Sequence, residues 1–254
     1  MTKPYFSSPR PRILAHRGLA VAAPENTLLA FRAAQDIGIT MIETDVHASS
    51  DGVAIVSHDD VLDRVAGRSG RVGHFTLAQL EAIDLGQGQG FSSLEAALAA
   101  FPETRFNIDI KSMDAAAPTV TAVQAAGAVD RVLLTSFSER RRRAAVRALP
   151  GVATSASGPV FAVALVLAKL GATPLLRRVL RDIDAVQVPV RAMGLTVASN
   201  RMIRRLQEAG VEVHFWTIND PVEMRRLLDL GADGIVTDRS DRGLRTVNER
   251  STKL

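Results

Sequence analysis

The sequence contains no cysteine, few lysines and few aromatic residues. Without cysteine the protein has no disulfide bonds, no thiolate-ligated metal site and no thiol nucleophile; the absence also fits a reducing compartment, so we expect a cytoplasmic protein. Only four of the 31 basic residues are lysines, and 27 acidic residues leave a net charge of +4. Aromatic residues make up 4% of the chain, which leaves little to stack on bases, and we predict no nucleic-acid partner.

Long hydrophobic runs are also missing. A membrane-spanning helix needs about 20 consecutive apolar residues, whereas Val160–Ala168, with nine, is predicted to be a buried helix. We therefore expect no transmembrane segment, and His16 and Arg17 argue against a signal peptide because they break the apolar run after Arg10 and Arg12. One basic cluster, Arg140–Arg143 with Arg147, is typical of a solvated helix face, with peripheral contact to a membrane or another anionic partner as the alternative.

What the chain does contain is a repeating pattern. Its 254 residues are 46% apolar, and a single α/β barrel typically takes about 250 residues. Eight short β-like runs follow one another along the chain. They are Arg12–His16, Met41–His47, Phe106–Lys111, Arg131–Ser136, Val152–Ser155, Ala185–Pro189, Val211–Thr217 and Gly234–Thr237.

Between these runs lie segments with apolar residues at helical spacing, such as Thr27–Ile37, Ala116–Ala126, Glu139–Leu149 and Pro221–Leu230. Strand–helix alternation indicates a parallel sheet, and eight units close a barrel. An open doubly wound sheet is the alternative, and its dinucleotide-binding version is disfavoured because no Gly-x-Gly-x-x-Gly turn follows the first run. We predict an α/β fold, a TIM-type (β/α)8 barrel that forms one domain over residues 1–254.

One stretch interrupts the alternation. Asp51-Gly52 separates the second run from Val53–Ser57, which predicts an antiparallel hairpin rather than a barrel strand. Residues 59–93 then contain many glycines and one helical piece near Leu77–Ile83. We interpret them as a small insertion after the second strand, at the barrel mouth and not a separate domain.

Ionisable residues gather where the β-like runs end. In a barrel the carboxyl ends of the strands form the face that carries active sites, and residues two apart on a strand share a side. The residues at these ends are His16, Arg17, Glu43, Asp45, His58, Asp109 and Lys111. We expect them to converge at one mouth of the barrel.

These residue types narrow the chemistry. Three carboxylates without thiolates suit one divalent cation, Mg²⁺ or Ca²⁺, better than zinc. Arg17 can grip a phosphate through two nitrogens, and Lys111 adds a point charge. His16 and His58 come from separate segments, and imidazoles can share general acid and general base roles. Together they suggest chemistry on a phosphoester.

With these residues the chain resembles the glycerophosphodiester phosphodiesterases, which belong to the barrel superfamily that also includes the phosphatidylinositol-specific phospholipases C. Seven stretches match in the family's order from residue 12 to about 240. They are His16-Arg17-Gly18, Pro24-Glu25-Asn26-Thr27, Glu43-x-Asp45-Val46, Asp51-Gly52 with His58-Asp59, Asn107-Ile108-Asp109-Ile110-Lys111, Phe215-Trp216-Thr217-Ile218-Asn219 and Asp233-Gly234-Ile235-Val236-Thr237-Asp238.

The resemblance implies metal-dependent hydrolysis of a glycerophosphodiester to glycerol 3-phosphate and an alcohol. It implies the following roles: His16 and His58 as the acid/base pair, Arg17 holding the phosphate, Lys111 neutralising developing charge, Trp216 walling the glycerol pocket, and Glu43, Asp45 and Asp109 binding the cation. The family usually has glutamate at the position of Asp109, and Ser92-Ser93-Leu94-Glu95 replaces its usual Pro-Thr-Leu-Glu.

Several alternatives stay open at the level of sequence. Lysophospholipase D activity uses the same chemistry but must accommodate an acyl chain. A barrel glycosidase is disfavoured because two carboxylates on one strand do not flank a sugar ring, and a non-catalytic phospho-ligand-binding barrel is disfavoured because both histidines and all three carboxylates are present. The choice of metal, the head group, the acid and base assignment, attack by water or by the substrate's 2-hydroxyl, and the oligomeric state are not determined.

Overall fold

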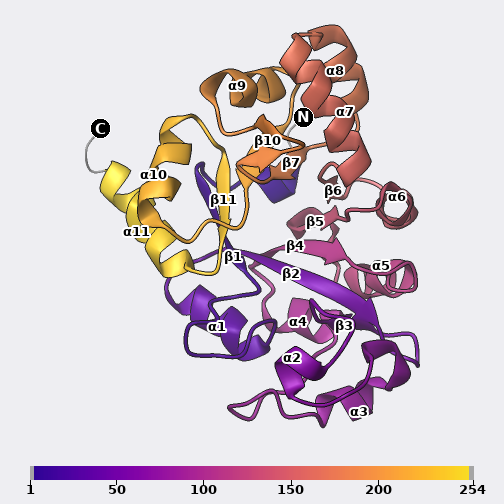
Figure 1. Cartoon of the computed structure of the whole chain (residues 1–254). Coiled ribbons are helices and arrows are strands. Elements are labelled where there is room, and N and C mark those ends of the chain that lie inside the picture. Colours follow the sequence, from indigo (N-terminus) through magenta and orange to yellow (C-terminus); the bar gives the residue numbers. More distant parts are fainter. Residues whose placement is uncertain (1–2, 252–254) are drawn as a thin grey trace.

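The computed structural model describes residues 3–251 of the chain, and its centre is a barrel of parallel strands (Figure 1). Each of the eight predicted runs forms one of these strands, with ends displaced by no more than two residues. In chain order they are β1 (Arg12–His16), β2 (Met41–Ala48), β4 (Arg105–Ile110), β5 (Val132–Thr135), β6 (Ala153–Thr154), β7 (Ala185–Val188), β10 (Glu212–Phe215) and β11 (Gly234–Thr237).

The strands pair in the order β6-β5-β4-β2-β1-β11-β10-β7, so the first strand lies beside the last. The circle is completed between β6 and β7, where Ser155 pairs with Ala185 and the Ala156 N–H donates to the Ala185 carbonyl at 2.9 Å. The predicted TIM-type barrel is confirmed.

Helices surround the barrel (Figure 1). They are α1 (Leu28–Asp36), α4 (Leu94–Ala100), α5 (Ala116–Ala125), α6 (Glu139–Ala148), α7 (Gly158–Leu170), α8 (Thr173–Leu180), α9 (Asn200–Glu208), α10 (Pro221–Asp229) and α11 (Ser240–Ser251). Short pieces add η1 (Pro4–Phe6), η3 (Val129–Arg131) and the two-stranded ribbon of β8 (Arg191–Ala192) and β9 (Leu195–Thr196). The four helical segments predicted from spacing are α1, α5, α6 and α10.

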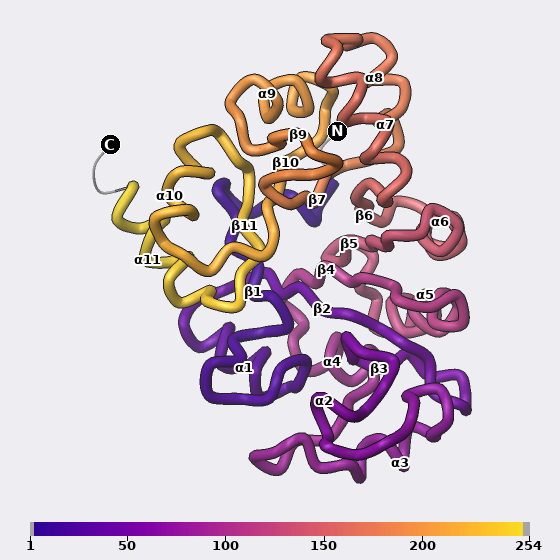
Figure 2. Tube along the Cα trace, viewed as in Figure 1, coloured from indigo at the N-terminus to yellow at the C-terminus, as the bar shows by residue number. Residues whose placement is uncertain are grey.

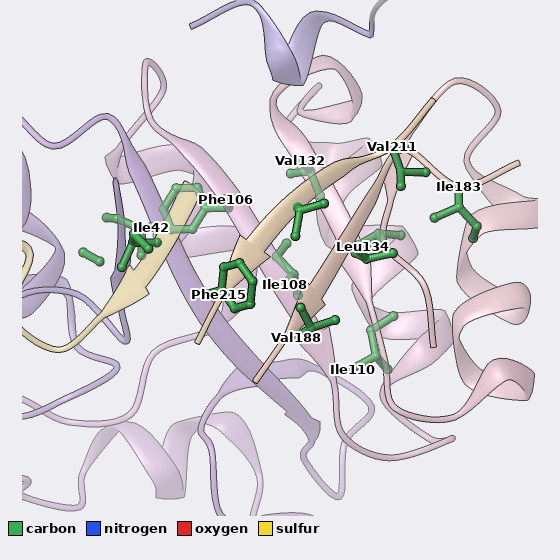
Figure 3. Packing of buried hydrophobic residues seen from close by; sticks show 14 of the residues in the cluster. Ile42, Phe106, Ile108, Ile110, Val132, Leu134, Ile183, Val188, Val211 and Phe215 are labelled. Carbon is green, nitrogen blue, oxygen red and sulfur yellow. The ribbon is translucent and has the colours of Figure 1, made fainter. Parts of the chain in front are cut away.

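Alternation along each strand separates two layers of side chains. Outward residues such as Ile42, Phe106 and Phe215 pack in the main hydrophobic cluster beneath the helices (Figure 3). Inward residues near the strand starts, Leu14 and Met41 among them, pack with Tyr5 of η1 in a second cluster. Because apolar side chains fill the barrel from this end, the inward positions at the carboxyl ends are left for polar groups.

The predicted hairpin is present as β3 (Ala54–Val56), which pairs antiparallel with the end of β2. Residues 59–93 follow it with α2 (Asp63–Ala66), η2 (Val72–His74) and α3 (Leu77–Glu81), and Figure 2 traces them below β3 in this view. The segment buries a small cluster together with Ile55 of β3. Its members are Ile55, Leu62, Val72, Leu80, Ile83 and Phe91.

Two expectations about helices need correction. The apolar stretch Val160–Ala168 lies in α7 but is buried on one face only, because Val163 and Val166 stay about half exposed where no neighbour covers them. The arginine cluster on α6 is not wholly solvated either: Arg142 is buried and bonds Glu139 and the Thr154 hydroxyl. Over residues 3–251 no helix is long and apolar enough to cross a membrane.

Candidate active site

The structure brings the predicted site residues together. A pocket of about 430 Å³ opens at the carboxyl ends of the barrel strands, and all eight of them line it. They are His16, Arg17, Glu43, Asp45, His58, Asp109, Lys111 and Trp216. Their convergence follows from the fold: Glu43 and Asp45 occupy alternate positions within β2, level with or beyond the end of β1, and the others lie at or just beyond the ends of their strands.

The carboxylates lie on two neighbouring strands. Asp45 of β2 is in register with Asp109 of β4, and Lys111 places its Nζ 2.8 Å from Asp45 Oδ1 and 2.7 Å from Asp109 Oδ2. Burial disfavours the charge on Asp45, but the Lys111 ammonium outweighs it and holds the pKa of Asp45 below its ordinary value. Burial likewise opposes the charge of Lys111, and the two carboxylates raise its pKa above the usual range.

Glu43 has no such partner. Its Oε2 accepts no hydrogen bond and lies 3.8 Å from His16 Nε2. Burial, with the nearby negative charge of Asp45, raises the pKa of Glu43 from 4.5 to about 8. Burial also raises the pKa of Asp109, and its Oδ1 is without a hydrogen bond.

The chemistry of these donors suits a divalent cation, although their present grouping does not form an ion site. Two buried carboxylate oxygens lack a partner, and all three acids provide the hard oxygen ligands that Mg²⁺ and Ca²⁺ take. As the side chains stand, no three Asp, Glu or His residues within 3–251 are grouped closely enough to hold an ion, and the Lys111 ammonium lies between two of the acids.

Each of the two histidines is anchored by a carboxylate. His16 Nδ1 lies 2.6 Å from Asp238 Oδ1, and His58 Nδ1 lies 2.6 Å from Asp59 Oδ1. These bonds engage Nδ1 and leave Nε2 of each ring for chemistry. Burial opposes protonation of His16, but the bond to Asp238 and the charge of Glu43 outweigh it and raise the pKa of that imidazole.

Arg17 is aimed into the pocket by the turn after β1. Its backbone is left-handed, with φ of 59°, a conformation that costs a non-glycine residue about 1–3 kcal/mol. At the next position a Cβ on Gly18 would come within 2.7 Å of the Ala30 backbone, so only glycine fits there. The Arg17 guanidinium donates to Glu25 Oε1 at 2.9 Å and places Nε 3.5 Å from Asp45 Oδ2.

Comparison with known proteins assigns the chain to a family. Residues 16–242 match the model of the Glycerophosphoryl diester phosphodiesterase family. The chain belongs to this family. It is 42% identical over 230 residues to the Mycobacterium tuberculosis protein named Probable glycerophosphodiester phosphodiesterase 2, covering 90% of this chain and 87% of that one.

Solved structures agree with the family assignment. The glycerophosphodiester phosphodiesterase from Agrobacterium tumefaciens is 27% identical with a TM-score of 0.75, covering 92% of this chain and 99% of that chain. A phosphodiesterase from Oleispira antarctica, solved with the product sn-glycerol-3-phosphate, shares the fold with a TM-score of 0.77 at 23% identity, covering 94% and 97% of the two chains.

The other wall of the pocket of this family member is apolar. Trp216 follows β10 and packs edge-on against Phe137, with ring centroids 6.0 Å apart. Phe161 of α7 and Pro189 complete this side, and Phe137 is 60% exposed. Polar groups for phosphate and apolar surface for the rest of a ligand thus face each other across the pocket.

Besides Glu25 and Asp59, which contact Arg17 and His58, four further residues near the site were not among the predicted ones. Asp238 follows β11, so the strand-end argument that selected His16 also applies to it. Asn26 donates to Asp45 Oδ2 at 3.2 Å, although its place before a helix suggests only capping. Asn107 and Gln187 bond each other inside the barrel at 3.2 Å, and each keeps one buried amide atom unpartnered. Both amides lie at inward-facing positions of predicted strands, so side-chain alternation could have identified this pair from the sequence.

Proposed function

We propose that this chain hydrolyses glycerophosphodiesters to glycerol 3-phosphate and an alcohol, with one divalent cation and a histidine acid/base pair. One observation carries the proposal: three buried carboxylates, two cationic side chains and two carboxylate-anchored histidines line a single pocket in a member of this family. The histidine roles rest on this geometry, and the metal rests on the chemistry of the three carboxylates.

The polar wall is suited to a phosphate group. Arg17 and Lys111 would hold the phosphoryl oxygens, and Lys111 would offset the charge that develops there. Glu43, Asp45 and Asp109 would hold the cation, which when bound acts as a Lewis acid on a phosphate oxygen. The unpartnered Glu43 Oε2 and Asp109 Oδ1 support this assignment.

The histidines would move the protons. One Nε2 takes the proton of the attacking hydroxyl, and the other gives a proton to the departing alkoxide, so that the P–O bond breaks without a free alkoxide leaving. Their carboxylate partners engage Nδ1 of both rings, which leaves Nε2 of each for proton transfer. Which ring is the base depends on the orientation of the substrate.

Release of glycerol 3-phosphate is the direct test. Purified protein stripped of metal is expected to release none from glycerophosphocholine or glycerophosphoethanolamine, and added Mg²⁺ or Ca²⁺ is expected to restore turnover. The turnover rates with Mg²⁺ and with Ca²⁺ show which cation a site that contains Asp109 prefers. No turnover with either ion on these diesters would contradict the proposal and move the search to lysophospholipids.

Lysophospholipids are the second candidate, and the apolar wall favours them. Phe137 is exposed at the pocket, and α7 and α8 carry further exposed apolar residues, namely Val163, Val166, Leu170 and Leu175. An acyl chain in the pocket would contact Phe137, and the exposed apolar residues of α7 and α8 suit peripheral contact with a membrane.

Phe137→Ala separates the two substrate classes. If an acyl chain contacts this ring, the variant is expected to raise KM for lysophosphatidylcholine about tenfold, since about 1.4 kcal/mol of lost apolar contact corresponds to a factor of ten. Glycerophosphocholine, which has no acyl chain, serves as the control in the same kinetic assay. An equal change in KM for both substrates would exclude the chain-binding role.

A further inference from the structure

A continuous series of ion pairs joins the two sides of the pocket mouth through Arg64. One end of the series is Arg17, the other is His58, and both line the pocket while Arg64 does not. Between them stand two carboxylates, Glu25 on the Arg17 side and Asp59 on the His58 side. Arg64 lies on α2, in the segment 59–93, and Figure 2 draws α2 next to the chain that leads into α1.

The contacts of Arg64 use three nitrogens on two acids. Its Nη1 and Nη2 donate to Glu25 Oε2 and Oε1 at 2.9 and 2.6 Å, and its Nε donates to Asp59 Oδ2 at 2.6 Å. Each acid also contacts a residue that lines the pocket. Glu25 Oε1 accepts a hydrogen bond from Arg17 at 2.9 Å, and Asp59 Oδ1 lies 2.6 Å from His58 Nδ1.

This arrangement differs from an ordinary surface ion pair. The Arg64 side chain is 49% exposed, but Glu25 and Asp59 are only 24% and 21% exposed, and the bond to Glu25 is bidentate. Burial opposes the charge of Glu25, but hydrogen bonds from Arg64 and the charge of Arg17 keep its pKa below the ordinary value. A lysine ammonium is a compact point charge and cannot reproduce a planar fork that serves both acids.

We infer that Arg64 is a positioning residue that holds two site groups at once, His58 through Asp59 and Arg17 through Glu25. The inference rests on the proposed roles of His58 and Arg17. If Arg64 has this role, the segment 59–93 is part of the active site, because α2 supplies the side chain that connects the turn after β1 to the loop after β3. Loss of Arg64 would free the His58 ring, which affects kcat, and the Arg17 guanidinium, which affects KM.

Arg64→Met is the test variant and Arg64→Lys the conservative one. We expect Arg64→Met to lower kcat/KM for glycerophosphocholine about 10- to 100-fold, the usual cost of misplacing a reacting group. Arg64→Lys is expected to give a kcat/KM between those of Arg64→Met and wild type. Arg68→Met is the matched control, since Arg68 lies in the same segment and its guanidinium contacts the Phe75 ring; it should stay within twofold of wild type.

Double variants distinguish positioning from a loss of structure. Added to Asp59→Asn, Arg64→Met should lower kcat little further, and added to Glu25→Gln it should raise KM little further, because each acid transmits the effect of Arg64. Additive losses, or wild-type kcat and KM in Arg64→Met, would overturn the inference. Thermal unfolding of each variant shows whether it is folded.

A readout without substrate separates this inference from the proposed function. The ¹⁵N resonances of His58, assigned with His58→Gln, report whether Nδ1 is held by Asp59. They should change in Arg64→Met and stay unchanged in Arg68→Met. If wild-type protein turns over no glycerophosphodiester but these resonances change as expected, the proposed function fails and the positioning stands; unchanged resonances overturn the positioning.

Discussion

Alanine at His16 or at His58 is expected to lower kcat for glycerophosphodiester hydrolysis by about 10²–10⁴-fold, the contribution of a general acid or base. Both rings line the pocket and both have Nδ1 engaged by a carboxylate. Either substitution removes the Nε2 that would carry a proton, while the phosphate-binding side chains Arg17 and Lys111 remain. We therefore expect kcat to fall much more than KM rises.

His74→Ala is the control for this pair, because His74 is exposed in η2 and does not line the pocket. Steady-state kinetics of the three variants on glycerophosphocholine measure the effect. A kcat within a few-fold of wild type in His16→Ala or His58→Ala would remove that residue from the proposed acid/base pair.

Glu43→Gln is expected to raise the stability of the metal-free protein and to lower the enzymatic activity. The folded-state pKa of about 8 lies above the ordinary 4.5, so the folded chain binds this proton more tightly than the unfolded chain does. Stability of the metal-free protein therefore falls as pH rises from about 4.5 through about 8. Glutamine carries no charge, and the variant escapes this loss.

Without metal at pH 8, Glu43→Gln should melt several degrees above wild type, and the difference should shrink toward pH 5. Each kcal/mol of the relieved cost corresponds to about 2–4 °C for a domain of this length. Activity should fall by about 10³-fold or more, since a metal ion contributes several kcal/mol to the transition state.

Melting curves with chelator and with added Mg²⁺ or Ca²⁺ test this prediction. The ions should raise the melting temperature of wild type and leave that of Glu43→Gln unchanged. Glu81→Gln, at an exposed position of α3, is the control for loss of one charge. An equal metal response in wild type and Glu43→Gln would remove Glu43 from the proposed ligand set.

Local patterns in the sequence are sufficient to predict the barrel and which of its two ends carries the polar groups. Period-two alternation and the turns between runs are local properties, so β1, β2 and β4 could be predicted along with the inward direction of Glu43, Asp45 and Asp109. The same alternation places their neighbours on the outer layer, where they pack beneath the helices.

Which of these groups touch one another depends on contacts between distant parts of the chain. His16 and Asp238 are 222 positions apart and meet because closure of the barrel sets β1 beside β11. Arg64 reaches Glu25 across 39 positions because the segment after β3 folds back over the turn after β1. Arg142 is buried, although its neighbours in the sequence suggest a solvated face. Such contacts depend on strand register and on the path of loops, which no short-range pattern in the sequence encodes.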